Sequence, residues 1–576
     1  MDDMTQQLDR WIANAQDPTV AQQLQDLRAG DETAVRDAFF QDLAFGTGGL
    51  RGIVGAGPNR MNVYTVAKAT QGLATYLNEH FDEPSVAIAR DSRNGGREFV
   101  EVAAGVLAAN GIRAYLYPRI EPTPALSFAV RDLGCSAGIC MTASHNPAAY
   151  NGYKAYGPDG CQITTQAAHD IQKAINDTDV FDDVRSIPFE EALASGMASY
   201  IDEDTLDRFI DAVAAQSLEG ADPALELKVV YTPLNGTGLE CVERILDRIG
   251  GVDVTLVQEQ AVPDGSFPTC PYPNPEIREA LERGLALCEQ VHPDLLLATD
   301  PDADRVGIAA EHDGDYVLIS GNEMGVLLLD YLCRARVARG EDLSRAVAVT
   351  TIVSTALVDA LAADYGFQLR RTLTGFKYIG EQIGLLEAAG QADRFIFGFE
   401  ESYGYLAGTH VRDKDAVVAS MLICQMARDY KARGLDLVEA LEQLYARYGY
   451  HRNATISLEY PGAAGAEKMA AIMERLCAEP PTELAGLPVT ACVDYHEGVA
   501  MPLVGSTGPA GAPDTPQTLP AAAVFEMQLE GGSKVIVRPS GTEPKIKAYL
   551  FAAAPTEEAA DALLGQLDGA ARELLA

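Results

Sequence analysis

The sequence contains no apolar stretch long enough to cross a membrane. Its longest apolar runs, such as GVLLLDYL (325–332), fall far short of the roughly 18 residues that a spanning helix needs. The first residues, MDDMTQQLDR, lack both the basic and the apolar segment of a secretion signal. No CxxC pair occurs among the ten cysteines between Cys135 and Cys492, which predicts buried or free thiols in a reducing compartment. We therefore expect a cytoplasmic protein without a membrane partner.

Basic residues are scarce as well. The chain has 44 Lys and Arg against 83 Asp and Glu, for a formal net charge of -39. A nucleic-acid partner needs a basic face that releases counterions from the phosphates, and this balance argues against one. A small anionic substrate stays compatible with it, because a few local cations can hold such a molecule whatever the net charge.

Composition and length are those of a large globular protein. Hydrophobic residues make up 47% of the chain and charged residues 22%, which excludes a disordered or fibrous chain. A chain of 576 residues is too long for one hydrophobic core, and roughly 150 residues per domain gives about four domains.

Hydrophobic periodicity indicates a helical start and then one unit that occurs three times. Apolar residues at helical spacing predict helices over 1–44, and a glycine-rich loop follows over 45–62. Each later unit has the order β-α-β-α-β. The predicted strands are 85–90, 111–118 and 135–141, then 227–232, 252–257 and 294–299, then 346–351, 367–372 and 393–399. The first unit has predicted helices over 97–110 and 124–134. The second has one that ends at Gly250 and one over 276–290, and the third has one that begins at Ser354 and one over 376–389.

This alternation predicts three similar α/β domains with mixed, mostly parallel sheets. The last section differs, with a Gly/Pro/Thr-rich loop over 505–520, the strands KVIVR and KIKAYLF, and a helix from Thr556. We expect it to form a C-terminal α+β domain. The predicted segments are a helical arm over 1–44 and domains over 45–205, 206–322, 323–452 and 453–576.

A polar loop follows the third strand of each unit. These loops are TASHNP (142–147), DPDADR (300–305) and EESYGY (400–405). Ligands of open α/β sheets bind beyond the carboxyl ends of the strands. The three domains could therefore present these loops to one central cleft.

The first loop places Ser144 in a turn. An exposed serine can carry a phosphoryl group, but serine also closes ordinary turns and caps helices. Nearby, Lys154 could exchange a proton with a sugar hydroxyl or be an ordinary solvated lysine.

The second loop places Asp300, Asp302 and Asp304 at every second position. In an extended loop their carboxylates would point to one side, and hard oxygen ligands suit Mg²⁺. Without a cation they would repel one another, which favours a metal site over a solvated acidic loop. An EF-hand is disfavoured because Arg305 replaces the turn glycine and 306–310 reads as a strand. A haloacid-dehalogenase phosphatase is disfavoured because it expects Thr or Val at Asp304.

Two further loops carry candidate ligand groups. Glu400 and Ser402 could bond sugar hydroxyls, although a solvated strand end would look the same. In RPSGTEPK (538–545), a guanidinium, two hydroxyls and backbone N–H groups offer what a phosphate dianion needs. Neither a Walker A sequence nor a complete GxGxxG occurs in the glycine-rich 45–62 stretch, so nucleotide binding has no support.

Together, the serine, three-aspartate, hydroxyl-binding and phosphate-binding loops, in that order, resemble the α-D-phosphohexomutase superfamily. The resemblance covers nearly the whole chain from about residue 45. FGTGGLRG (45–52), LTGFK (373–377), GFEESYGY (398–405) and RDKDAV (412–417) look most like the branch of phosphoglucomutases and phosphopentomutases.

The resemblance implies four domains around a deep cleft and a phosphoryl group carried by Ser144. By this resemblance, Mg²⁺ would be held by Ser144, Asp300, Asp302 and Asp304, and Lys154 and His145 would act as acid and base. Arg51 and Arg305 would lie near the transferring phosphoryl group. The sugar would be bound by Thr374, Glu400, Ser402 and Lys414, and the other phosphate by Arg538, Ser540, Gly541 and Thr542.

The resemblance also implies the reaction. Phosphoserine would convert glucose 1-phosphate into glucose 1,6-bisphosphate, which turns over and leaves as glucose 6-phosphate after its other phosphate returns to Ser144. Mannose or pentose phosphates are alternative substrates for the same mechanism. An aspartyl-type phosphatase with Asp300 as nucleophile, or a non-catalytic sugar-phosphate sensor, would be a different class. We expect a monomer, with a homodimer as the alternative, and small sugar phosphates as the only partners.

Overall fold

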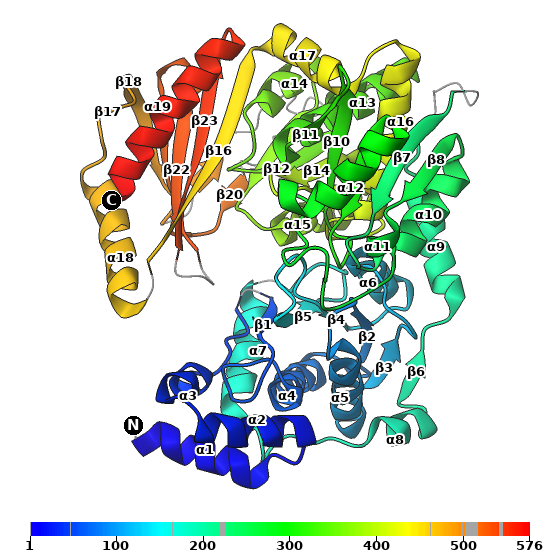
Figure 1. Cartoon of the computed structure of the whole chain (residues 1–576), viewed down its shortest axis with the longest axis vertical. Helices are drawn as coiled ribbons and strands as arrows, with labels where there is room; N and C mark the ends of the chain where they lie inside the picture. The colour runs from blue at the N-terminus through cyan, green and yellow to red at the C-terminus, as the bar shows by residue number, and fades with distance from the viewer. Residues whose placement is uncertain are drawn as a thin grey trace. The chain divides into compact units, whose positions relative to one another are not determined.

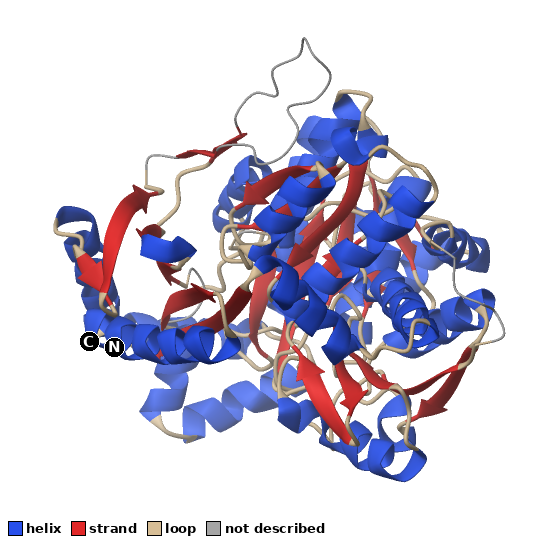
Figure 2. Ribbon diagram, turned by 90° about the horizontal axis from the view of Figure 1, so that it is seen from above, coloured by secondary structure: helices blue, strands red, loops and turns tan. Residues whose placement is uncertain are grey.

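The computed structural model describes residues 2–46, 48–163, 165–218, 225–460, 462–496, 499–501, 517–540 and 545–576. The chain forms two compact units, which we describe separately. The first comprises Met1–Leu318 and Gly404–Gln425, and the second comprises Ile319–Tyr403 and Met426–Ala576. Figure 1 labels the elements along the chain, and Figure 2 distinguishes helices from strands.

The helical start is confirmed and consists of α1 (Asp2–Asn14), α2 (Pro18–Ala29) and α3 (Glu32–Phe39). The Asp17 side chain caps α2 by accepting a hydrogen bond from the backbone of Val20 at 2.8 Å. The buried Trp11 ring packs edge-on against three other rings. These belong to Phe39, Tyr64 and Phe181, at centroid distances of 6.1, 5.6 and 5.2 Å.

The first α/β group of strands and helices, called the first layer below, has a six-stranded mixed sheet in the order β1-β5-β4-β2-β3-β6. Its strands are β1 (Gly49–Ile53), β2 (Ser85–Arg90), β3 (Arg113–Leu116), β4 (Ala137–Met141), β5 (Tyr150–Tyr156) and β6 (Ala198–Tyr200). Its helices are α4 (Val63–His80), α5 (Gly96–Ala109), α6 (Thr123–Asp132), α7 (Thr165–Asp177), α8 (Phe189–Ala194) and α9 (Glu203–Ala214). Strands β2, β3, β4 and β6 are parallel, whereas β5 runs antiparallel to β4 and β1.

The second layer has a five-stranded sheet in the order β11-β10-β9-β7-β8. Its strands are β7 (Leu227–Thr232), β8 (Val252–Leu256), β9 (Leu295–Thr299), β10 (Val306–His312) and β11 (Asp315–Ile319), and its helices are α10 (Gly238–Ile249), α11 (Gln258–Ala261) and α12 (Arg278–Val291). The sheet brings its metal-candidate loop very close to a neighbouring turn. A Cβ on Gly236 would lie 2.4 Å from Pro301 Cα, so only glycine fits there.

In the second unit, β12 (Val347–Thr351) lies between β13 (Gln368–Thr372) and β14 (Phe395–Glu400) and is parallel to both. Before the C-terminal domain, the other elements of this unit are α13 (Gly321–Ala338), η1 (Leu343–Arg345), α14 (Leu357–Tyr365), α15 (Phe376–Ala388), η2 (Ala392–Arg394) and α17 (Leu437–Tyr448). Between β14 and α17 the chain also forms β15 (Gly404–Leu406), which belongs to the first unit, and α16 (Ala416–Ala432), which the first unit includes as far as Gln425. The three β-α-β-α-β series are therefore confirmed. The helix predicted from Ser354 begins only at Leu357, because the Thr355 hydroxyl accepts the Leu357 N–H and closes a turn first.

The C-terminal domain has an antiparallel sheet in the order β16-β23-β22-β21-β18-β17. Its elements are β16 (Tyr450–Glu459), α18 (Gly462–Ala478), β17 (Glu483–Leu484), β18 (Leu487–Asp494), β19 (Val499–Met501), β20 (Gln517–Leu519), β21 (Phe525–Leu529), η3 (Glu530–Gly532), β22 (Lys534–Pro539), β23 (Lys545–Ala554) and α19 (Glu557–Leu575). The loop predicted over 505–520 is wrong at Gln517–Leu519, which pairs with β19, and residues 505–516 lie outside the described part.

Two general expectations can be compared with the described residues. All ten cysteines are free thiols, eight of them buried, as the absence of a CxxC pair predicts. Among the helices that the structure describes, none is both long and apolar enough to cross a bilayer.

A buried carboxyl lies where the first two layers meet. The Glu121 side chain, 2% exposed, accepts a hydrogen bond from Arg119 Nε at 2.9 Å. Arg119 also bonds Glu203 and Glu240, on α9 and α10. Burial, opposed by Arg119 and assisted by Glu240, raises the pKa of Glu121 to about 7.

We expect Trp11→Ala to lower the free energy of unfolding by about 3–5 kcal/mol, because it removes a buried ring with three aromatic partners. Phe40, which is 53% exposed, supplies the matched control, and Phe40→Ala should change stability by about 0.5 kcal/mol or less. Urea unfolding followed by circular dichroism measures both. Equal losses in the two variants would contradict the packing described here.

The raised pKa of Glu121 predicts a pH-dependent stability. Because the folded pKa of about 7 exceeds the unfolded value of 4.5, the native state retains a proton that the unfolded state releases between these values. The stabilising effect of this proton is therefore fully present below pH 4.5 and is lost as the pH rises from there through 7. From pH 5 to pH 8, the parent should lose about 2–3 kcal/mol relative to Glu121→Gln in urea unfolding. A constant difference between the two proteins would contradict the pKa shift.

Candidate active site

Ser144 lies in the loop after β4, with its hydroxyl directed at the aspartate loop of the second layer. The residue is buried, at 3% exposure, and has a left-handed φ of 50°. Its Oγ donates a hydrogen bond to Asp300 Oδ2 at 2.7 Å, and its backbone N–H donates to Thr142 Oγ1 at 2.8 Å. The loop therefore holds a nucleophilic hydroxyl against a carboxylate that is 156 residues away in the sequence.

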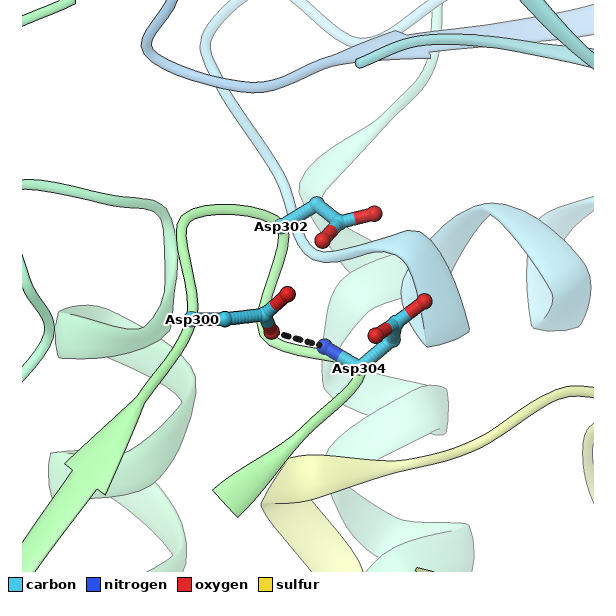
Figure 3. Close-up of side chains that lie close together, drawn as sticks. All are labelled: Asp300, Asp302 and Asp304. Carbon is cyan, nitrogen blue, oxygen red and sulfur yellow. Dashed lines mark hydrogen bonds between the residues drawn. The ribbon is translucent and has the colours of Figure 1, made fainter. Parts of the chain in front are cut away.

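The three aspartates converge as predicted, but for a different reason. One carboxylate oxygen of each lies within 4.8 Å of the others, and all three residues are buried. The loop is a turn rather than an extended segment, since Ala303 has a φ of 49° and donates its N–H to the Asp300 carbonyl at 2.9 Å. Asp300 Oδ1 accepts the backbone N–H of Asp304 at 3.1 Å (Figure 3). It also accepts the backbone N–H of Arg305 at 2.9 Å. The expectation of an extended loop was wrong.

The electrostatics of this group fit a bound cation. Burial, together with Asp302 and Asp304, raises the pKa of Asp300 well above its usual value. Burial also opposes ionisation of Asp302, but Lys154 outweighs it and lowers the pKa of Asp302. The Oδ1 atoms of Asp302 and Asp304 are buried and accept no hydrogen bond from the described residues. Buried acceptors without donors are costly, and a hard divalent cation would satisfy them.

Two lysines lie beside the aspartates. Lys154, on β5, donates from Nζ to Asp302 Oδ2 at 2.7 Å and to Asp304 Oδ2 at 3.0 Å. Burial opposes its charge, but these carboxylates outweigh burial and raise the pKa of Lys154 well above its usual value. Lys414 Nζ lies 3.2 Å from Asp304 Oδ2 and 3.0 Å from Asp413 Oδ1. Lys414, which is predicted as a sugar ligand, therefore also belongs to the group of charges around Asp304.

Of the remaining predicted residues of the first unit, His145 contacts Ser144, and Arg51 and Arg305 bond other side chains. His145 Nδ1 lies 3.2 Å from Ser144 Oγ, and burial together with Arg305 and Arg51 lowers the pKa of His145 well below its usual value. The imidazole is therefore neutral at pH 7. Arg51 Nη1 donates to Asn146 Oδ1 at 3.0 Å, and Arg305 Nη1 donates to Glu276 Oε1 at 2.6 Å.

The predicted ligands of the second unit form a separate set. Arg538 Nη1 donates to the Thr374 hydroxyl, and Glu400 Oε1 accepts the backbone N–H of Gly375 at 2.7 Å. This brings β14, β22 and the turn before α15 together. Ser402 is half-buried, and the Ser540 N–H donates to the Lys545 carbonyl at 2.8 Å. Gly541 and Thr542 lie outside the described residues.

Some residues of the site carry no recognisable signal in the sequence. Thr123 holds Asp302 twice, from its Oγ1 to Asp302 Oδ2 at 2.7 Å and from its backbone N–H to the Asp302 carbonyl at 2.8 Å. Arg93 binds the serine loop from a turn that the sequence marks only by its glycines and polar residues. Such contacts join separate segments, so local spacing does not predict them.

Comparisons with known proteins agree with this geometry. The phosphoglucomutase/phosphomannomutase α/β/α domains I, II and III match residues 42–180, 207–314 and 320–448, more than half of the chain. A phosphoglucomutase of Staphylococcus aureus (strain bovine RF122 / ET3-1) is 37% identical over 548 residues, which cover 95% of each chain.

Solved structures share the fold. A protein of Thermus thermophilus assigned as a phosphomannomutase has a TM-score of 0.68 at 24% identity and covers 93% of this chain and 99% of its own. Parafusin, a phosphoglucomutase of Paramecium, has a TM-score of 0.68 at 17% identity, with coverage of 93% and 95%. From the family matches and the 37% identity to a relative of equal extent, the chain belongs to the phosphoglucomutase/phosphomannomutase family.

Proposed function

We propose that the protein is a phosphoglucomutase that interconverts glucose 1-phosphate and glucose 6-phosphate through phosphorylated Ser144 and a glucose 1,6-bisphosphate intermediate. The single observation that carries the proposal is the 2.7 Å hydrogen bond from Ser144 Oγ to Asp300, inside a group of three buried aspartates and two lysines. The name of the 37% identical relatives supports glucose over mannose or a pentose.

The aspartate group is proposed to hold Mg²⁺ through Asp300, Asp302 and Asp304, with a phosphoserine oxygen as a further ligand. Carboxylate oxygens are the ligands that Mg²⁺ prefers, and two of them are buried without a donor among the described residues. When bound, the ion would supply positive charge to the oxygens of the transferring phosphoryl group. Lys154 and Lys414 lie 3.0 and 3.2 Å from Asp304 Oδ2 and add positive charge beside the carboxylates.

Proton transfer to and from the sugar hydroxyl is assigned to Lys154 and His145. In the forward step, the bond from phosphorus to Ser144 Oγ breaks as the bond to the sugar oxygen forms. The proton of the sugar hydroxyl passes to a base, and the departing Ser144 Oγ takes up a proton from an acid to become the hydroxyl again. Burial and two arginines keep the imidazole of His145 neutral, so it can accept a proton. Its Nδ1 lies 3.2 Å from Ser144 Oγ, within reach of the transferring group.

Substrate binding is assigned to the remaining predicted site residues. Arg51 and Arg305 would bind oxygens of the transferring phosphoryl group, since Arg51 donates to Asn146 in the serine loop and Arg305 Nε lies 3.7 Å from Asp304 Oδ1 in the aspartate loop. The sugar ligands are proposed to be Thr374, Glu400, Ser402 and Lys414, and the ligands of the other phosphate Arg538, Ser540, Gly541 and Thr542. The five-segment domain division, the monomeric state, the cytoplasmic location and the absence of nucleic-acid and membrane partners remain predictions from the sequence.

The covalent intermediate can be tested by labelling. After incubation with ³²P-labelled glucose 1,6-bisphosphate, the parent protein should carry acid-stable phosphate, and Ser144→Ala should carry none and show no mutase activity. Asp300→Asn separates the mutase from an aspartyl phosphatase. The proposal predicts that this variant still retains label on Ser144, although transfer slows. Label that is lost in Asp300→Asn and retained in Ser144→Ala would contradict it.

The metal site predicts dependence on a divalent cation. Chelation should reduce mutase activity to background, and added Mg²⁺ should restore it. Asp302→Asn should weaken Mg²⁺ affinity by about 10–100-fold or more in titration calorimetry. Asp313→Asn removes the same charge from a side chain that is 95% exposed and serves as the matched control. Full activity after chelation, or equal affinities in both variants, would refute the site.

Substrate preference can be ranked by competition. The purified protein would be followed by phosphorus NMR with Mg²⁺, a trace of glucose 1,6-bisphosphate, and equal glucose, mannose and ribose 1-phosphates. We expect the glucose ester to be converted fastest. Faster conversion of the mannose or ribose ester would reassign the substrate while leaving the mechanism intact.

A further inference from the structure

Arg93 binds the serine loop with its guanidinium group. Nη1 donates to the carbonyls of Pro147 and Tyr150 at 2.8 and 2.9 Å. Nη2 donates to the carbonyl of Ser144 at 2.6 Å and also to that of Asn146. One side chain therefore contacts four carbonyls of the loop, including that of the proposed nucleophile.

The other contacts of Arg93 leave its side chain little freedom. Its Nε lies 3.2 Å from Asp91 Oδ2, and both side chains are fully buried. This contact is an ion pair without a hydrogen bond from Nε, so the four hydrogen bonds of the guanidinium all come from Nη1 and Nη2 and all go to the loop. The Phe267 ring lies under the guanidinium, with Cζ 5.0 Å from the centroid. A Cβ on Gly265 would lie 2.5 Å from Asn94 N, so the second layer also packs tightly against this turn.

The loop needs such a fixed support because Ser144 has an unfavourable backbone conformation. A φ of 50° is uncommon for a residue other than glycine, and it persists only where the surroundings enforce it. This conformation directs Oγ toward Asp300. Four hydrogen bonds to a charged donor, on carbonyls that span Ser144 to Tyr150, are strong enough to impose it.

We infer that Arg93 is a positioning residue that holds the serine loop in the conformation required for phosphoryl transfer. Among the described residues, its hydrogen bonds go only to carbonyls of the loop, and none goes to the three aspartates or to the hydroxyl of Ser144, so we assign its effect on the reaction to the loop backbone. The inference rests on the proposed function, because it concerns the rate of transfer from Ser144. A merely structural arginine would affect the folded fraction and not the rate constant of folded molecules.

The test is Arg93→Ala, with kcat and KM measured per folded molecule and with guanidinium ion added at concentrations far below those that unfold proteins. A displacement of about 1 Å at the nucleophile should lower kcat by about 100-fold, while KM for glucose 1-phosphate stays near the parent value. Added guanidinium should enter the vacated space and restore kcat by about tenfold. Methylammonium, a cation without the planar fork, should restore nothing.

Arg394→Ala is the matched control. Arg394 is also buried, at 6% exposure against 2% for Arg93, and donates from Nε to the carbonyl of Arg345 at 2.7 Å. It belongs to the second unit, whereas Ser144 belongs to the first. Its removal should leave kcat per folded molecule unchanged and insensitive to guanidinium.

The outcomes separate this inference from the proposed function. If the parent converts glucose 1-phosphate and Arg93→Ala keeps the parental kcat, or loses rate without response to guanidinium, Arg93 is not a positioning residue. If Arg93→Ala does not fold, Arg93→Lys replaces it, and a parental kcat in that variant overturns the inference. If the parent shows no mutase activity at all, the proposed function fails, independently of the result for Arg93.

Discussion

Three carboxylates buried within one turn are the constraint on which the rest of the site depends. Asp300, Asp302 and Asp304 are each no more than 1% exposed, and three charges at such distances cannot remain unpaired in a protein interior. Lys154 and Lys414 approach Asp304, and backbone N–H groups at the turn bind Asp300. The two oxygens that remain without donors among the described residues are where a divalent cation would bind.

This constraint explains why distant segments meet at this turn. Lys154 belongs to the first layer, and Lys414 lies much later in the chain, after β15. The Nζ atoms of both lysines nevertheless form ion pairs with the same carboxylate, that of Asp304. Thr123 fixes Asp302 from the start of α6, and Ser144 is held to Asp300 from the loop after β4. The same contacts that neutralise the aspartates therefore place a nucleophile beside them. Function and stability share one set of interactions here.

The sequence predicts the elements well where the signal is local. The strand over Leu227–Thr232 and the start of α15 at Phe376 agree with the prediction because apolar runs and turn residues define them. The sequence predicts a start of α14 that is three residues early, since the Thr355 side chain closes a turn that periodicity does not show. The sequence predicts that the three aspartates converge, which the structure confirms, but it predicts an extended loop where the structure has a turn.

Contacts between segments account for what the sequence does not reveal. The position of Lys414 beside Asp304, the hydrogen bonds of Thr123 and the four carbonyls bound by Arg93 all join residues that are far apart in the chain. No periodicity or spacing encodes such pairs, because they depend on the packing of whole layers.

The central claim is that Ser144 gives its phosphoryl group to a sugar hydroxyl and not to water. The most direct measurement charges the enzyme with ³²P-labelled glucose 1,6-bisphosphate, removes the excess, and mixes it with unlabelled glucose 1-phosphate for a single turnover in the presence of Mg²⁺. The account predicts that the label leaves the protein and appears in the sugar phosphates. Label that appears instead as inorganic phosphate, at a rate independent of the sugar, would contradict it.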